Sequence, residues 1–123
     1  MKSPYEIKKE ICEVGHVLYQ LGFVAANDSN ISVKISDNEY YCTPTGVSKR
    51  VLTPDMIIKV DRNGNKLEGK MNPSSEIKMH MRVYQERPDV NAVVHAHPPV
   101  ATAFTIAGVD LDQYILPEAV LTI

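Results

Sequence analysis

The chain has 123 residues, of which 44% are hydrophobic and 23% charged, and this composition is typical of one globular domain rather than a disordered segment. The 13 basic and 15 acidic residues give a formal net charge of -2, and no run of Lys or Arg exceeds two, so an extended nucleic-acid or anionic-membrane surface is excluded. No apolar stretch approaches the roughly 20 residues of a membrane span, and the N-terminus lacks a signal-peptide core, so we expect a cytoplasmic protein.

The first predicted element is a helix that begins near Ser3 and ends at Gly22. Ser3, Pro4 and Glu6 suit the N-cap, N1 and N3 positions of a capping box. Apolar residues then recur at helical spacing, namely Ile7, Ile11, Val14, Leu18 and Leu21.

A β-hairpin, a short strand and a turn are predicted next. The expected segments are a hairpin of residues 31–35 and 40–43, a loop at 43–46, a strand at 56–60 and a turn at 63–64. Cys12 in the first helix and Cys42 in the hairpin form no CxxC pair, so we expect reduced, buried and inert thiols.

A second helix is predicted to begin at Asn72-Pro73, as N-cap and N1, and to end at Arg87-Pro88, which places Ser74 and Ser75 in its first turn. The remaining expected segments are a strand at 92–96, a short helix at 100–107, an extended stretch at 111–116 and an apolar, β-prone run at 118–123. Helices and short strands alternate without a repeat or linker, so the class is α/β or α+β. Because natural termini are more often polar, we expect residues 1–123 to be the N-terminal part of a longer single domain.

Two histidines are candidates for metal binding. His95 and His97 are two residues apart on a predicted strand, so their side chains should lie on the same face. Zinc accepts imidazole nitrogens, and a catalytic zinc usually has three protein ligands and an open position. The spacing alone leaves a metal site and an ordinary polar strand end equally open.

A carboxylate and several small polar residues are candidates for acid/base chemistry and phosphate binding. Glu76 follows Ser74 and Ser75 at the helix start, where it either only stabilises the helix dipole or acts as a general base. The two serines and the backbone N–H groups there can cradle a phosphate. Further small donors stand in loops, at Asn30, Thr45 and Gly46, although turn and cap chemistry explains each of them alone.

The two other histidines are assigned no site role. His16 lies next to the apolar stripe of the first helix, and His80 follows Glu76 by four residues on one helical face. A Glu-x-x-x-His metal pair is conceivable, but a boundary histidine hydrogen-bonded to a neighbour is the favoured interpretation for both.

Four motifs in order along the chain together resemble the class II aldolase family, of the L-fuculose-1-phosphate aldolase and L-ribulose-5-phosphate 4-epimerase type. They are Asn30-Ile31-Ser32, Thr43-Pro44-Thr45-Gly46, Asn72-Pro73-Ser74-Ser75-Glu76 with His80, and Ala92-Val93-Val94-His95-Ala96-His97. The resemblance implies a three-layer α/β/α sandwich with a largely antiparallel central sheet, here incomplete at the C-terminus, and a homo-oligomer, usually a fourfold-symmetric tetramer. No nucleic-acid or membrane partner is implied.

The resemblance also implies a role for each candidate residue. His95 and His97 match zinc ligands, and Glu76 matches the catalytic acid/base. The phosphate-binding positions match Asn30, Thr45, Gly46, Ser74 and Ser75. The cofactor implied is one Zn²⁺ per subunit, which would polarise the oxygens of a phosphorylated sugar substrate.

Two departures from the family pattern stand out. Ser29 replaces a glycine found in many members, so the backbone before Asn30 has less freedom. The family's third zinc histidine has no counterpart, because no histidine follows His97. We therefore expect the 123-residue chain alone to bind zinc weakly and to lack aldolase activity.

The implied function is a lyase that cleaves a phosphorylated ketose to dihydroxyacetone phosphate and an aldehyde by retro-aldol chemistry. Glu76 favours an aldolase over the epimerase, which has Asp there, while a sugar-phosphate dehydratase or decarboxylase stays open. A non-catalytic scaffold like the adducin head domain is the alternative from another class, and the retention of His95, His97 and Glu76 argues against it.

Overall fold

The computed structural model describes residues 2–23, 29–97 and 118–121. In chain order its elements are α1 (Pro4–Gln20), β1 (Asn30–Ser36), β2 (Glu39–Cys42), the 3-10 turns η1 (Lys49–Val51) and η2 (Pro54–Met56), β3 (Ile58–Val60), β4 (Lys66–Glu68), α2 (Ile77–Glu86), β5 (Ala92–His95) and β6 (Glu118–Leu121). The segments expected at 100–107 and 111–116 lie outside the described residues. Across the described ranges, no helix combines the length and the apolar character that a membrane span requires.

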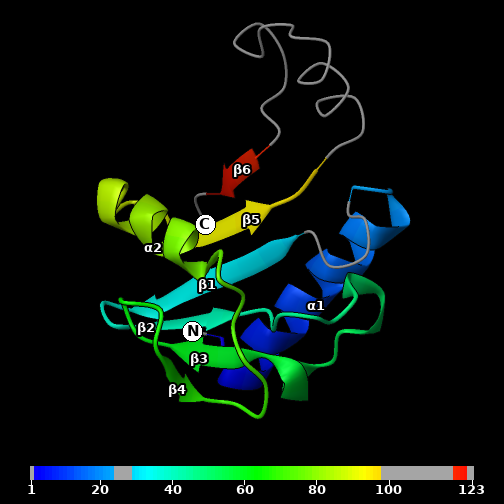
Figure 1. The fold of residues 1–123 in the computed structure, drawn as a ribbon, viewed down its shortest axis with the longest axis horizontal. Helices are drawn as coiled ribbons and strands as arrows, with labels where there is room; N and C mark the ends of the chain where they lie inside the picture. The colour runs from blue at the N-terminus through cyan, green and yellow to red at the C-terminus, as the bar shows by residue number, and fades with distance from the viewer. Residues whose placement is uncertain (1, 24–28, 98–117, 122–123) are drawn as a thin grey trace, which may run out of the picture.

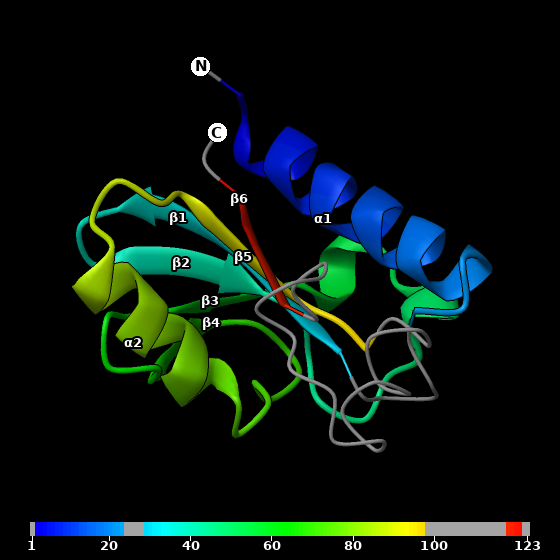
Figure 2. The same ribbon diagram turned by 90° about the horizontal axis from the view of Figure 1, so that it is seen from above.

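The strands form one antiparallel sheet in the order β4-β3-β2-β1-β5-β6 (Figure 1). Viewed from above, α1 lies over one face of this sheet and α2 over the other (Figure 2). The expected three-layer α/β/α arrangement with an antiparallel sheet is therefore confirmed.

Strand alternation divides the apolar residues between two cores, because successive side chains point to opposite faces. Tyr40 and Val93 face α2, while their neighbours Tyr41 and Val94 face α1. The α1 core contains Ile11, Cys12, Ile31, Tyr41, Leu52, Ile57 and Val94. The α2 core contains Tyr40, Cys42, Ile58, Val60, Ile77, Tyr84, Val90 and Val93. Each fully buried aliphatic side chain contributes about 1.5–3 kcal/mol to stability.

The predicted boundaries of α1 are confirmed, but its buried face is narrower than the apolar stripe. The Ser3 hydroxyl accepts a hydrogen bond from the Glu6 backbone N–H at 3.2 Å, as expected of an N-cap. Val14 and Leu21 are 38% and 57% exposed. The face of α1 that packs against the sheet contains the buried residues Ile11, Cys12 and Gly15.

The two cysteines behave as the sequence predicts. Cys12 and Cys42 are both buried free thiols, one in each core. Burial raises the pKa of the Cys12 thiol to about 11 and that of the Cys42 thiol to about 12. Both thiols therefore stay protonated and unreactive at neutral pH.

The predicted start of the second helix is wrong by four residues, because α2 begins at Ile77 with Glu76 as N-cap. Ser74 and Ser75 therefore precede the helix and do not lie in its first turn. Residues 72 and 73 are held in extended conformation against the loop after β2. Pro73 forms an isolated antiparallel bridge with Pro44, and the Thr45 N–H donates to the Asn72 carbonyl at 2.9 Å. Pairing between two segments that are distant in the sequence thus prevents Asn72-Pro73 from starting the helix.

The predicted strand at 56–60 is also shorter than expected. Its first residue, Met56, is the last residue of η2, whose turn is closed by the Met56 N–H donating to the Thr53 carbonyl at 3.0 Å. The strand proper, β3, begins at Ile58. The turn after it is as predicted, with Gly64 at φ 83° leading into β4.

Candidate active site

Three of the predicted site residues meet where α2 begins above the sheet. Asn30 and His95 stand directly opposite each other on the neighbouring strands β1 and β5. The carboxylate oxygen Oε2 of Glu76, the N-cap of α2, reaches both of them. It accepts from Asn30 Nδ2 at 2.5 Å and from His95 Nδ1 at 2.9 Å. A cross-strand pair and a helix N-terminus therefore hold one carboxylate between them.

The surroundings of Glu76 favour its ionised form. The hydrogen bond from Asn30 is the main cause that lowers the pKa of this carboxyl, partial burial opposes it, and His95 lowers it further. The side chain is still 47% exposed, so a small molecule can approach it. Nearby, burial lowers the pKa of the Lys49 ammonium on η1, and the charge of Glu76 raises it. The site thus contains a solvent-accessible carboxylate base.

His95 and His97 lie side by side, although only His95 belongs to a strand. β5 ends at His95, which is buried, and His97 follows as an exposed residue whose N–H donates to the Phe23 carbonyl at 2.8 Å. Their ring centroids are 4.8 Å apart at an interplanar angle of 60°. The expectation of adjacent rings is met, while the expectation of one continuous strand through residue 97 is wrong.

The donor chemistry of this pair fits zinc. Because the ionised Glu76 carboxylate can only accept, His95 Nδ1 must carry the proton, and a neutral ring then has its lone pair on Nε2. A carboxylate that fixes the tautomer in this way is the usual partner of a zinc-binding histidine. Among the described residues no group of three His, Cys, Asp or Glu side chains is arranged to hold a metal ion. Two nitrogen donors fit the ion, and the described part of the chain supplies no third.

The residues predicted to bind phosphate fall into two places. Thr45 and Gly46 are exposed in the loop that pairs with residues 72–73, so this loop adjoins Ser74 and Ser75. The Ser74 hydroxyl accepts from the Glu76 N–H at 3.2 Å, which connects this pair of segments to the carboxylate.

The side chain of Asn30, in contrast, is directed at Glu76 and not at those loops. Its neighbour Ser29 has a buried hydroxyl without a hydrogen-bond partner among the described atoms. A buried unpaired hydroxyl is unusual and is typical of a position that a ligand or water satisfies.

His80 belongs to the site although the sequence does not predict it there. His80 is a residue of α2, and its side chain is fully buried between this helix and β1. One ring nitrogen, Nε2, bonds Asn30 Oδ1, and the other, Nδ1, bonds Ser32 Oγ at 2.6 Å. The Ser32 hydroxyl also bonds the Tyr84 hydroxyl at 2.8 Å. Because both nitrogens of His80 are engaged, the conceivable Glu76–His80 metal pair does not form. His16 is as expected, since its Nε2 donates to the Leu52 carbonyl at 2.9 Å.

A spacing match in the sequence could have revealed His80. Glu76, His80 and Tyr84 recur every four residues on α2, a rise of about 6 Å, while Asn30 and Ser32 are two apart on β1, a rise of about 6.7 Å. The spacing of polar residues at i and i+4 on a helix therefore nearly equals the spacing of polar residues at j and j+2 on a strand, so the two sets can pair along their length. We call these five residues the polar ladder.

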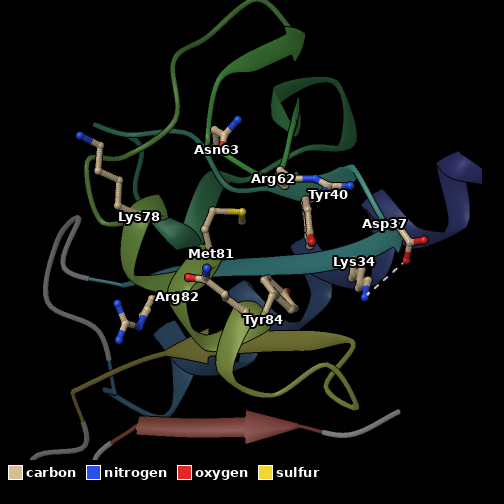
Figure 3. A pocket seen from close by; sticks show the side chains of 10 residues that line it. Lys34, Asp37, Tyr40, Arg62, Asn63, Lys78, Met81, Arg82 and Tyr84 are labelled. Carbon is tan, nitrogen blue, oxygen red and sulfur yellow. Dashed lines mark ion pairs between the residues drawn. The ribbon is translucent and has the colours of Figure 1, made fainter.

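A separate cavity of about 730 Å³ opens beside the second half of α2. Its floor includes the Tyr40 and Tyr84 rings, whose centroids are 4.8 Å apart, and none of the predicted site residues lines it. Figure 3 shows Lys78 and Arg82 extending away from Tyr40. These two cationic side chains therefore do not converge on a common point in the cavity.

Comparison with known proteins agrees with the motifs. Residues 9–122 match the sequence model of the family described as Class II Aldolase and Adducin N-terminal domain. An L-fuculose phosphate aldolase of Methanococcus vannielii is 40% identical over 111 residues, which cover 90% of this chain and 59% of that protein. A methylthioribulose-1-phosphate dehydratase of Pseudomonas syringae pv. tomato is 39% identical over 103 residues, which cover 84% of this chain and 50% of that protein.

The fold is shared with solved structures as well. An L-fuculose 1-phosphate aldolase superposes with a TM-score of 0.74 at 33% identity, over 80% of this chain and 47% of that one. The chain spans about half the length of the curated relatives it matches. Because the family match extends over nearly the whole sequence and the three-layer fold agrees with it, the chain belongs to the class II aldolase and adducin N-terminal domain family.

Proposed function

We propose that this chain is the N-terminal part of a single-domain, zinc-dependent lyase that cleaves a phosphorylated ketose of the L-fuculose 1-phosphate type. The products are dihydroxyacetone phosphate and an aldehyde. The observation that carries the proposal is the shared contact of the Glu76 carboxylate with Asn30 and His95, next to the His97 ring. A fixed base beside two imidazoles that can bind a metal ion suits metal-assisted carbon-carbon cleavage.

In this proposal the substrate's phosphate lies between two loops. Thr45 and Gly46 approach it from the loop after β2, and Ser74 and Ser75 from the turn before α2, which the Thr45–Asn72 hydrogen bond keeps adjacent. Small hydroxyl side chains and backbone N–H groups at a helix start suit a phosphate without requiring a cationic surface. The net charge of -2 agrees with such a local site.

His95 and His97 would hold the zinc ion, which supplies Lewis-acid polarisation of the substrate's carbonyl and hydroxyl oxygens when bound. The chain's own contribution is to keep His95 in one tautomer through Glu76. The proposal includes a third protein ligand outside the described residues and, by family resemblance, a cytoplasmic homotetramer.

Glu76 would carry the proton to and from the reacting part of the substrate. Its lowered pKa leaves it ionised at neutral pH, so it starts as a base. Asn30 and His95 both donate to the same oxygen, Oε2, which fixes the plane of the carboxylate. A fixed carboxylate loses little entropy on reaching the geometry of the reaction.

A sugar-phosphate dehydratase is the second candidate. The 39% identity to the Pseudomonas syringae dehydratase favours it, because that identity is nearly as high as to the aldolase. Both reactions need a base close to the metal-bound substrate, so Glu76 fits either one. The epimerase, the decarboxylase and the non-catalytic adducin-like scaffold are the remaining alternatives.

The deciding experiment assays the protein that contains this sequence against a panel of phosphorylated ketoses and sugar acids, with zinc present and after chelation. We expect zinc-dependent release of dihydroxyacetone phosphate from a ketose 1-phosphate. Loss of water without cleavage would identify a dehydratase. A protein that purifies without zinc and acts on none of the panel would identify a scaffold.

A further inference from the structure

The polar ladder under α2 has a hydrogen-bond direction that chemistry alone fixes. An ionised carboxylate only accepts, so the end of the Asn30 amide that faces Glu76 must be the NH₂ group. Its carbonyl oxygen, Oδ1, then faces His80, and only a protonated Nε2 can donate to it. A neutral His80 is left with a lone pair on Nδ1.

The direction continues down the sheet face from His80. Its Nδ1 lone pair accepts from the Ser32 hydroxyl, and the Ser32 oxygen in turn accepts from the Tyr84 hydroxyl. Every donor in the series therefore points toward Glu76. Aligned hydrogen bonds of this kind polarise one another and strengthen the last bond of the series.

The hydrogen bonds of the polar ladder are buried, unlike those between polar side chains on the protein surface. Ser32 and His80 are 0% exposed and Asn30 is 6% exposed, so each of these polar groups has lost its contact with water. Their hydrogen bonds roughly offset that loss, and apolar residues of similar volume would stabilise a core equally well. The ladder ends at Glu76, its only half-exposed member.

We infer that His80 is a positioning residue: its Nε2–H tautomer fixes the orientation of the Asn30 amide, which in turn holds the Glu76 carboxylate against His95. The role of Glu76 in turnover rests on the proposed function, whereas the positioning itself is a property of this chain. His80 does not touch the substrate or the metal in this account. Its effect reaches the reaction only through Asn30.

The first test is NMR of the protein that contains this sequence, with ¹⁵N-labelled histidine and asparagine and without metal. We expect the His80 ring to show a protonated Nε2 and an unprotonated Nδ1. We also expect the Asn30 side-chain NH₂ to exchange slowly with water, because it is bonded to a carboxylate. A proton on Nδ1 of His80, or fast exchange of the Asn30 amide, would overturn the inference.

The second test uses two substitutions of His80 that differ in reach. The amide nitrogen of His80→Gln stands near the position of Nε2 and can still donate to Asn30. The shorter His80→Asn can only accept from Ser32. The slow exchange of the Asn30 amide should therefore survive in the Gln variant and disappear in the Asn variant. If His80→Asn does not fold, His80→Ala replaces it, and Asn30 exchange as slow there as in wild type counts against the inference.

The same pair of variants is then assayed in the protein that contains this sequence. Loss of a group that orients an active-site residue typically costs about 10- to 100-fold. We expect His80→Asn to lose that much in kcat with KM nearly unchanged, and His80→Gln to stay close to wild type. Equal kcat values for the two variants would contradict positioning. If wild type cleaves no sugar phosphate, the proposed function fails while the NMR result still decides the inference.

Discussion

The two faces of the sheet are built from the same strands but differ in kind. Against α1 the hydrophobic cluster includes Ile11, Ile31 and Val94, and the buried Lys49 side chain of η1 lies beside it, against Gly15 of α1. Against α2 an apolar cluster is joined by the buried groups of Ser32 and His80, which lead to Glu76. The apolar cluster against α1 can thus be explained by stability alone. The α2 face carries polar groups that stability does not require.

The difference predicts that substitutions will separate stability from activity according to the face they alter. The largest effect should come from Glu76→Gln, which keeps the size of the side chain and removes its ability to exchange a proton. Acid/base groups contribute about 100- to 10,000-fold, so kcat should fall by that factor while zinc and phosphate binding persist. Steady-state kinetics with a zinc assay measures both.

The control for this variant is Glu86→Gln at the other end of α2. Glu86 forms a surface ion pair with Arg82 at 3.0 Å, so its loss should leave turnover unchanged. A Glu76→Gln protein with a near-normal cleavage rate would remove Glu76 from the mechanism.

Ile11→Ala should act on the other face through stability alone. Ile11 is buried in the α1 core, and truncating such a side chain costs about 2–5 kcal/mol. The free energy of unfolding, measured in urea, should drop by that amount, while kcat of the remaining folded protein stays the same. A fall in kcat comparable to that of Glu76→Gln would show that the two faces are not independent.

The buried His80 should make stability depend on pH in a defined window. Burial is the main cause that lowers its pKa from 6.5 to about 4, with His95 lowering it further and Glu76 raising it. Above pH 6.5 the ring is neutral in both the folded and unfolded states, so the protein is most stable there. Between pH 6.5 and 4 only the unfolded state gains the proton, and stability is lost, on the order of 3 kcal/mol in total.

The measurement compares urea unfolding of wild type and His80→Gln across that pH range. Carboxyl groups titrate in both proteins, so their contribution cancels in the difference. The wild-type free energy of unfolding should fall more steeply than that of the variant. Parallel curves would mean that His80 is protonated in the folded state as easily as in the unfolded state.

The smallest of these effects should come from Ser75→Asp, which places a negative charge where the substrate's phosphate is proposed to lie. Ser75 is exposed, so folding should be little disturbed. Losing about 1.4 kcal/mol of uniform binding raises KM about tenfold without changing kcat. Kinetics with Ser75→Ala as control measures the charge effect, and an unchanged KM would place the phosphate elsewhere.

Much of the fold could be predicted because its signals are local. The capping residues Ser3 and Glu6, the alternation in β1 and the turn at Gly64 each depend on neighbours in the sequence. The start of α2 could not be predicted, because the bridge between Pro44 and Pro73 overrides a helix signal across the chain. Local propensity is weak compared with such tertiary pairing.

The residues of the candidate site also differ in whether a local sequence signal points to them. The spacing of His95 and His97 and the place of Glu76 beside Ser74 and Ser75 make these residues candidates, and the family resemblance implies their roles. His80 was missed because one strand and one helix must be aligned before its partners, Ser32 and Asn30, become visible. A histidine four residues after a carboxylate is common on helix surfaces, so the pattern within the helix was not informative by itself.

Zinc titration by calorimetry of the protein that contains this sequence tests the central claim most directly. The compared variants are His95→Gln, His97→Gln and His16→Gln, the last on the α1 side with its ring bonded to the Leu52 carbonyl. We expect the first two variants to bind zinc more weakly than wild type and His16→Gln to bind it equally well. Undiminished zinc binding by both His95→Gln and His97→Gln would contradict the account, because the metal would then lie away from Glu76.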